Sequence, residues 1–416
     1  MDIDPLRHRL NELLAADDAA RAARYPGPMI ARQPIHTVYV PGDRFSADTV
    51  SDWGAAAIDA LNAYGPLPDF DRYPGLERQV HEKLRTEPIE DLRIDFEDGY
   101  GLRPDETEDR DVIAAARALR AATQSPSGGP LALGIRMKSL EGPFRDRGLR
   151  TVNLFLESLV ASGETTLPAG FRLTLPKVSS VAQVLAMVEA CGAFEDGFSL
   201  PEGALRFEIQ IETPQAVLGE DGTALVARMI HAAGSRCAGL HYGTYDYSAS
   251  VGIAAAFQSM EHPAADHAKA VMQVAAAGTG VPVSDGSTNM LPVGDAVAVR
   301  SGWALHARLV RRSLERGFYQ GWDLHPAQLP TRFAATFAFY LDGLPAAVGR
   351  LQRYLSRSAS GILDEPATAQ ALAGFLARGL DCGAFGDRDI LEVAQAVAPD
   401  GLVLDRTLLN QLAKRG

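Results

Sequence analysis

Short runs of apolar and β-branched residues alternate along this chain with longer segments in which apolar residues recur at helical spacing. Residues 151–163, for example, repeat apolar side chains at i, i+3, i+4 and i+7, and residues 306–317 end on basic residues and a glycine, a typical helix C-terminus. The strand-like runs cover 36–41, 92–97, 131–137, 171–178, 205–212, 237–243, 281–285 and 318–325. The predicted helices between them cover 48–63, 105–123, 150–161, 180–191, 223–234, 263–277 and 295–316.

This alternation of strands and helices favours a parallel sheet. Eight repeats over about 290 residues match a (β/α)₈ TIM barrel, which typically needs about 250 residues. An open doubly wound sheet is the rival architecture, and it usually carries a glycine-rich phosphate turn after its first strand. Here the first strand leads into residues 41–50, which contain neither G-x-G-x-x-G nor a P-loop. The pattern therefore predicts an α/β protein of the TIM-barrel class.

The same pattern divides the chain into three parts. Residues 1–35 form an N-terminal helical segment, and residues 36–330 form the catalytic barrel. Residues 64–90 are rich in proline and are expected to be an irregular insertion within the barrel. Residues 331–416 change to a purely helical pattern and are expected to form a C-terminal extension that serves as a cap, an oligomer arm or a lid.

Composition narrows the classes of function. The net charge of −12 and the pI near 5.3 argue against a nucleic-acid-binding surface. No apolar run reaches the roughly 18 residues of a membrane span, and the N-terminus lacks the apolar core of a signal peptide. The three cysteines, Cys191, Cys237 and Cys382, are scattered and suggest neither a metal site nor a disulfide framework. We therefore expect a cytoplasmic protein, with buried thiols rather than a catalytic cysteine.

Candidate chemistry lies where the predicted strands end, because active sites of TIM barrels lie at the carboxyl ends of their strands. Folding alone would favour apolar residues and turn formers at these positions. Polar residues are found there instead: Asp43 and Arg44, Asp95, Glu97 and Asp98, Arg136 and Lys138, Lys177, Glu212, His241 and Asp246, Asp285, and Asp323 and His325.

Glu212 and Asp246 form the most informative pair among these residues. Glu212 closes an otherwise apolar strand, and Asp246 follows the next strand through a glycine-containing turn. Neighbouring strands lie about 4.8 Å apart. Two carboxylates at this separation, completed by waters, suit Mg²⁺. The alternative interpretation, that Glu212 caps a helix and Asp246 is an ordinary turn acid, is about equally compatible with the spacing.

Three further residues carry a functional and a structural interpretation. Arg136 could hold a substrate carboxylate with its planar fork, or pair with Glu97 or Asp98. Lys177 could be a Schiff-base lysine, although an ion pair at the barrel end is favoured. His325 could be a general base or only a residue that caps a turn.

Seven motifs occur in order along the chain: VYVPGDR, IDFEDGYG, GIRM, LPKV, QIETPQAV, GLHYGTYDYSASVG and GWDLHPAQLP. Together they resemble the HpcH/HpaI aldolase and citrate lyase β-subunit superfamily, which includes malyl-CoA lyases and is related to malate synthases. The resemblance covers about residues 36–330. It implies a (β/α)₈ barrel whose Mg²⁺, for which Mn²⁺ can substitute, is held by Glu212 and Asp246.

The resemblance also assigns roles to other positions. Arg136 would hold the carboxylate of a 2-oxo or 2-hydroxy acid, and Glu97 and Asp98 would lie beside the waters on the metal. Arg44 would lie near the site or near the phosphate tail of CoA. The chain departs from the family pattern in Gly99–Tyr100, in Tyr245 before the metal aspartate, and in RMKS at 136–139. These departures leave the substrate and the use of CoA open.

The resulting hypothesis is a Mg²⁺-dependent carbon–carbon lyase or aldolase that acts on a small 2-oxo or 2-hydroxy carboxylic acid, free or as a CoA thioester. The base would be Glu97, Asp98 or His325, and Lys177 would join Arg44 and Arg136 in binding substrate. Phosphoryl transfer on an enolpyruvate, a Schiff-base aldolase built on Lys177 and a non-catalytic citrate lyase β-like subunit are the alternatives. We expect a homo-oligomer that binds neither nucleic acid nor membranes.

Overall fold

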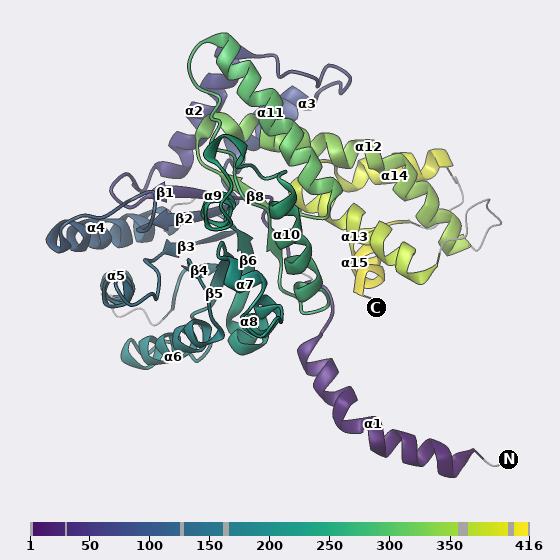
Figure 1. Ribbon diagram of the computed structural model, residues 1–416. Helices are drawn as coiled ribbons and strands as arrows, with labels where there is room; N and C mark the ends of the chain where they lie inside the picture. The colour runs from purple at the N-terminus through teal and green to yellow at the C-terminus, as the bar shows by residue number, and fades with distance from the viewer. Residues whose placement is uncertain are drawn as a thin grey trace.

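Eight parallel strands form a barrel at the centre of the computed structural model, which describes residues 3–29, 31–124, 129–160, 166–356, 365–397 and 403–414 (Figure 1). The strands are β1 (His36–Pro41), β2 (Asp91–Asp95), β3 (Ala132–Arg136), β4 (Phe171–Leu175), β5 (Phe207–Ile211), β6 (Cys237–Tyr242), β7 (Val283–Ser284) and β8 (Gly321–Asp323). Each strand from β1 to β6 pairs with the next in sequence, and β8 pairs with β1, so that β7 and β8 stand at the two ends of the strand order. Backbone hydrogen bonds from Asp285 to Gln320 and from Trp322 to Gly286 bring β7 and β8 together. The predicted (β/α)₈ TIM-barrel fold is confirmed.

Helices surround the barrel at the positions that the apolar periodicity predicts. These are α2 (Thr49–Tyr64), α4 (Asp105–Thr123), α5 (Arg145–Val160), α6 (Val181–Gly197), α8 (Leu225–Ala233), α10 (Pro263–Ala276) and α11 (Ala296–Glu315). Two short helices, α7 (Pro214–Val217) and α9 (Thr244–Ser250), follow β5 and β6 directly. Of the two predicted metal ligands, Glu212 lies between β5 and α7, and Asp246 lies within α9.

One prediction about the barrel is wrong. Residues 64–90 are not irregular throughout, because Leu76–Thr86 form helix α3. Its residues Val80 and Leu84 are buried, and Lys83 forms an ion pair with buried Glu90. The prolines that suggested an irregular segment all lie outside this helix, in the stretches before and after it.

The interior of the barrel is polar, whereas the outward face of strands β2 to β5 is apolar. On β2, Asp91, Arg93 and Asp95 point inward, and Leu92 and Ile94 pack under the helices. Deep in the barrel, buried Arg93 forms ion pairs with Asp91 and with Glu208 of β5. A second layer joins other inward side chains: Gln210 donates to Tyr39, and Trp322 donates to His241. The charged strand ends form the layer above, at the mouth of the barrel.

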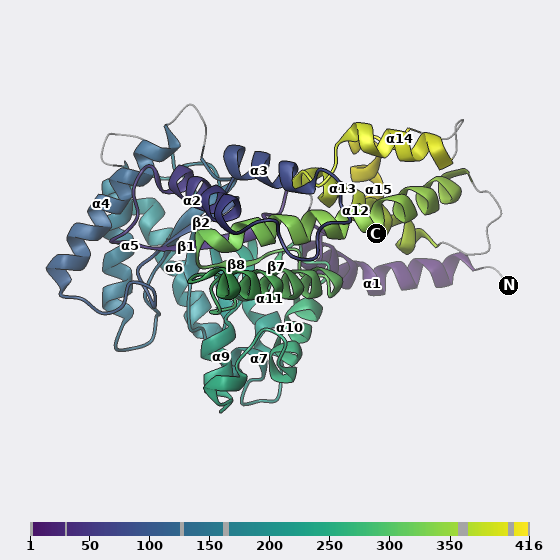
Figure 2. The same cartoon turned by 90° about the horizontal axis from the view of Figure 1, so that it is seen from above.

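Beyond β8 the chain is helical, with α12 (Leu329–Ser356), α13 (Pro366–Cys382), α14 (Asp387–Val397) and α15 (Arg406–Lys414). Figure 2 shows α12 leading from the barrel to the other three. One continuous core of buried apolar residues extends from the barrel helices into this extension. No helix among the described residues is long and apolar enough to cross a membrane.

A buried ionic network ties α11 and α12 to the barrel. Asp323 Oδ2 accepts from His36 Nδ1 at 2.8 Å, and its Oδ1 lies 3.1 Å from His306 Nε2. Arg332 of α12 donates to both oxygens, at 3.0 and 2.9 Å. Burial alone would raise the pKa of Asp323, but Arg332 and the two histidines outweigh it and hold this pKa well below its ordinary value.

Candidate active site

Four of the predicted acids meet around Lys177 at the mouth of the barrel. Its Nζ lies 2.7 Å from Glu97 Oε1, 2.9 Å from Asp98 Oδ2 and 2.9 Å from Asp246 Oδ2. Its backbone N–H donates to Glu212 Oε1 at 2.6 Å. The residue has a left-handed backbone with φ of 52°, which is unusual for a side chain of this kind and is typical of functional sites. The structure thus joins residues that are up to 149 positions apart, from Glu97 to Asp246.

Glu212 lies at the end of β5 and is 2% exposed. Burial, with the negative charges of Asp246 and Glu97 adding to it, raises the pKa of Glu212 to about 8. Asp246 lies in the first turn of α9 and is more open to solvent. Thr213, not Glu212, caps α7, because its side chain accepts the N–H of Ala216. The Glu212 carboxylate therefore remains available to the site.

Gly243 makes room for this carboxylate. It follows β6 directly, and a Cβ atom at this position would lie 2.4 Å from Glu212 Oε2 and 2.5 Å from Glu212 Cβ. Atoms cannot approach so closely, so any side chain at 243 would push the Glu212 carboxylate away from its observed position. The observed position of the Glu212 carboxylate therefore requires a glycine at position 243.

Glu97 and Asp98 are adjacent carboxylates whose environments separate their pKa values. Burial raises the pKa of Glu97 to about 7, and the neighbouring Asp98 adds to the shift. Burial acts in the same direction on Asp98, but its hydrogen bond with Glu97 and the charges of Arg136 and Lys177 lower its pKa to about 2. A carboxylate pair of this kind can divide acid and base roles.

Arg136 is held by Asp95, a residue for which the sequence suggested no role. The two lie directly opposite each other in the β2–β3 pairing. Arg136 Nε donates to Asp95 Oδ1 at 2.7 Å and Nη2 donates to Oδ2 at 2.6 Å, while Nη1 lies 3.5 Å from Glu97 Oε2. Because Asp95 takes the Nε edge, the Nη1 end of the fork remains for a second anion. Tyr39 supports the guanidinium, which lies 4.8 Å from its ring centroid.

Lys138 holds the acidic loop that follows β2. Its buried Nζ donates to the carbonyls of Phe96 and Gly101, at 2.6 and 3.2 Å, and pairs with Glu108 at 3.3 Å. The N–H of Gly99 donates to Asp95 Oδ2 at 2.8 Å, where a Cβ atom would lie 2.6 Å from that oxygen. The departures from the family pattern at Gly99 and Lys138 therefore shape the loop that presents Glu97 and Asp98.

His325 and Arg44 lie apart from the acids. The Nδ1 of His325 accepts the N–H of Ala327 at 3.1 Å, at the start of a 3₁₀ turn, and burial lowers its pKa. Arg44 lies exposed in the turn after β1. Within the described ranges, no hydrogen bond or ion pair joins either residue to Lys177 or to the carboxylates around it. Their proposed roles remain predictions.

The three cysteines are reduced and buried. Burial raises the pKa values of Cys191, Cys237 and Cys382 to about 12, so their thiolates are scarce at neutral pH. The expectation of buried thiols is confirmed.

A family model described as "Domain of unknown function (DUF6986)" matches residues 14–404. The chain belongs to the DUF6986 family. No curated protein matches this DUF6986 chain.

Several solved structures are similar to this chain. A Haloferax volcanii malate synthase, native at 3 mM glyoxylate, is 14% identical, with 92% of this chain and 97% of that chain covered and a TM-score of 0.50. A Mycobacterium tuberculosis citrate lyase β subunit complexed with oxaloacetate and magnesium is 18% identical, with 74% and 98% covered and a TM-score of 0.42. A Burkholderia cenocepacia HpcH/HpaI aldolase/citrate lyase family protein is 16% identical, with 74% and 92% covered and a TM-score of 0.41. The likeness to the malate synthase, with its TM-score of 0.50, supports the barrel fold.

Proposed function

We propose that this chain is a Mg²⁺-dependent carbon–carbon lyase or aldolase for a 2-oxo or 2-hydroxy carboxylic acid. The observation that carries the proposal is the cluster of Glu97, Asp98, Glu212 and Asp246 around Lys177, beside an arginine whose Nη1 end has only the 3.5 Å contact with Glu97 among the described residues. Such a cluster can bind a cation, orient a carboxylate and exchange a proton within one barrel mouth.

The residues present fit a magnesium ion. Hard carboxylate oxygens on neighbouring strands are the ligands that Mg²⁺ prefers, and Glu212 and Asp246 supply two of them. Gly243 keeps the space at Glu212 free of a side chain, and Lys177 shows that these acids accommodate positive charge. The described part of the chain contains no group of three or more His, Cys, Asp or Glu side chains that is arranged to hold a metal ion by itself. Water and substrate would therefore complete the coordination, as is usual for Mg²⁺.

In this proposal the other side chains bind the substrate and transfer the proton. Bound Mg²⁺ supplies Lewis-acid stabilisation of negative charge that develops on the substrate's carbonyl oxygen. Arg136 binds the substrate carboxylate through its Nη1 end, and Asp95 keeps the guanidinium plane in place. Glu97, whose pKa is close to 7, takes or returns the proton at the carbon or hydroxyl group that reacts. Arg44 is our candidate for the phosphate groups of a CoA thioester.

The test is a screen of 2-hydroxy acids and their CoA thioesters for cleavage, and of 2-oxo acids for condensation. EDTA should abolish the activity found, and Mg²⁺ or Mn²⁺ should restore it. Comparing free acids with thioesters, in the wild type and in Arg44→Ala, decides whether CoA is used. Activity that persists in EDTA, or the absence of turnover across the whole panel, would overturn the proposal.

Lys177 is not expected to form a Schiff base. Burial acts against its charge, but Glu212, Glu97 and Asp246 outweigh burial and raise the pKa of Lys177, so the amine stays protonated at neutral pH. Borohydride added with any active 2-oxo acid should therefore leave the enzyme unlabelled in intact mass spectra and fully active. A reduced adduct that disappears in Lys177→Met would show the opposite mechanism.

Gly243→Ala should weaken Mg²⁺ binding because the new methyl group displaces Glu212 Oε2. We expect a loss of about tenfold or more in affinity, measured by titration calorimetry. Gly239→Ala is the matched control on the same strand, since a Cβ there would meet its nearest atoms at an ordinary 3.6 Å. Equal affinities in the two variants would contradict the steric role of Gly243.

We further propose that the chain self-associates through α1 (Asp4–Arg24). Figure 1 shows α1 projecting from the body, and none of its residues is buried. Leu6, Leu10 and Leu13 lie on one face at helical spacing and are 40%, 44% and 75% exposed. Isolated helices are marginal in water and gain stability chiefly by packing such a face.

Light scattering after gel filtration tests this role of α1. Leu10→Glu with Leu13→Glu should lower the measured mass to that of the monomer. Ala15→Glu with Ala19→Glu adds the same charge to the opposite face and should leave the oligomer intact. A wild-type chain that is monomeric at micromolar concentration, or a mass that both variants share with the wild type, would count against it.

A further inference from the structure

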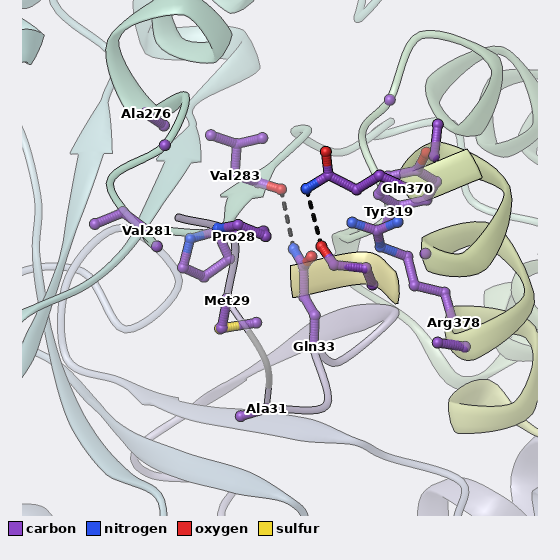
Figure 3. A pocket seen from close by; sticks show the side chains of 18 of the residues that line it. Pro28, Met29, Ala31, Gln33, Ala276, Val281, Val283, Tyr319, Gln370 and Arg378 are labelled. Atoms are coloured by element: carbon purple, nitrogen blue, oxygen red, sulfur yellow. Dashed lines mark hydrogen bonds between the residues drawn. The ribbon is translucent and has the colours of Figure 1, made fainter. Parts of the chain in front are cut away.

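A cavity of about 460 Å³ lies at the end of the barrel opposite the candidate active site. It is enclosed by the segment before β1, the starts of β7 and β8, and helices α13 and α15 (Figure 3). The acids and Arg136 lie at the carboxyl ends of the strands, and none of them lines this cavity. Its volume lies within the range of small-molecule sites, about 300–1,000 Å³.

Arg378 of α13 is a positively charged residue that lines this cavity. Its guanidinium stacks on Tyr319, with its central carbon 4.2 Å from the ring centroid. In the described part of the chain Arg378 makes no ion pair. Asp381 also lines the cavity, and its charge is paired with Arg406 at 2.7 Å. Stacking fixes the plane of an arginine and leaves its in-plane donors available for a bidentate oxyanion.

Two amide side chains face the same space. Gln33 donates to the carbonyl of Val283 at 3.2 Å, and Gln370 donates to the carbonyl of Ala413 at 2.9 Å. No described residue donates to the side-chain oxygen of either glutamine, so both oxygens can accept from a ligand. Figure 3 shows Gln33, Gln370 and Arg378 converging from the barrel side and the helical side. The remaining lining is mostly alanine, glycine and proline, which leaves the volume open.

We propose that this cavity binds a small hydroxylated organic anion. Its carboxylate or phosphate group pairs with Arg378, and its hydroxyl groups donate to Gln33 and Gln370. Because the lining comes from the N-terminal segment, the barrel base and the C-terminal helices, the bound anion fastens these three parts together. The site is separate from the proposed lyase chemistry, so it can be tested without any catalytic assay.

The experiment titrates the full-length protein in EDTA, at constant ionic strength, with malate, citrate, glycerol 3-phosphate and inorganic phosphate. We expect at least one hydroxylated anion to bind and to raise the Tm by on the order of 3 °C at saturation. The preferred probe distinguishes a carboxylate from a phosphate ligand. Arg378→Ala should weaken binding about tenfold to a hundredfold, because it removes a charge-assisted bidentate contact.

Two control variants separate this cavity from the barrel mouth. Arg388→Ala removes an exposed arginine of α14 and should leave the affinity unchanged. Arg136→Ala removes the anion-binding residue of the candidate active site, so the binding that depends on Arg378 should persist in this variant. Arg378→Gln, which retains the length of the side chain, serves if the alanine variant fails to fold. The proposal is overturned if no probe binds, if Arg378 variants bind as the wild type does, or if only Arg136→Ala loses binding.

Discussion

Replacing Glu212 by glutamine is expected to lower Mg²⁺ affinity by at least a hundredfold and turnover by about 10²–10³-fold or more. The substitution keeps the shape of the side chain but removes the buried carboxyl group of the proposed metal pair. Without this charge, negative charge that develops on the substrate loses its Lewis-acid partner, and electrostatic losses of this kind have about that size. Asp246→Asn should have the same direction of effect.

Metal affinity should be measured by calorimetry or by Mn²⁺ electron paramagnetic resonance, so that the result does not depend on knowing the substrate. Glu220→Gln, an exposed glutamate in the loop after β5, is the matched control and should behave as the wild type. If Glu212→Gln retains full metal affinity while turnover falls, Glu212 acts otherwise than as a ligand. If both are retained, the proposed site is wrong.

Asp323→Ala should destabilise the folded protein by about 3–5 kcal/mol, the usual cost of removing one partner from a buried ionic network. The substitution leaves Arg332, His36 and His306 without their shared acceptor, and all three are buried. The change is measured as the shift in urea midpoint, followed by circular dichroism. Glu261→Ala breaks an exposed pair with Arg308 instead and should cost at most about 1 kcal/mol.

The pH dependence gives an independent check on Asp323. Because its folded pKa lies well below the ordinary value of about 3.9, its contribution to stability is complete above that value and is lost as the pH falls below it. The wild type should therefore lose more stability than Asp323→Ala between about pH 5 and pH 2. Parallel losses in the two proteins would show that Asp323 is not the group responsible.

The fold could be predicted from the sequence because strands buried under helices appear as short apolar runs between longer segments with helical periodicity. Alternating strand and helix patterns, repeated eight times, have few architectural solutions. Helix α3 was missed because flanking prolines dominate the pattern around residues 76–86. The polar barrel interior was also missed, although the alternation of Asp91, Arg93 and Asp95 with apolar residues carries its signal.

The candidate site was predictable only as a set of strand ends. The sequence indicated which acids and bases would lie at the mouth of the barrel. Which of them contact one another depends on the register of the strands, and the sequence pattern does not predict that register. Asp95 became the partner of Arg136 because the two are paired across β2 and β3. Lys177 contacts three acids from a left-handed backbone conformation, and a lysine at this position does not predict such a conformation.

The steric relation between Gly243 and Glu212 also has an evolutionary consequence. A chain that replaces the glycine loses room for the acid, and a chain that has lost the acid no longer needs the glycine. The two positions should therefore be inherited together, although they are 31 positions apart in the sequence. Across the DUF6986 family, glycine with glutamate would mark members that retain the proposed metal site. The joint loss of both would mark members in which the barrel has taken on a different role.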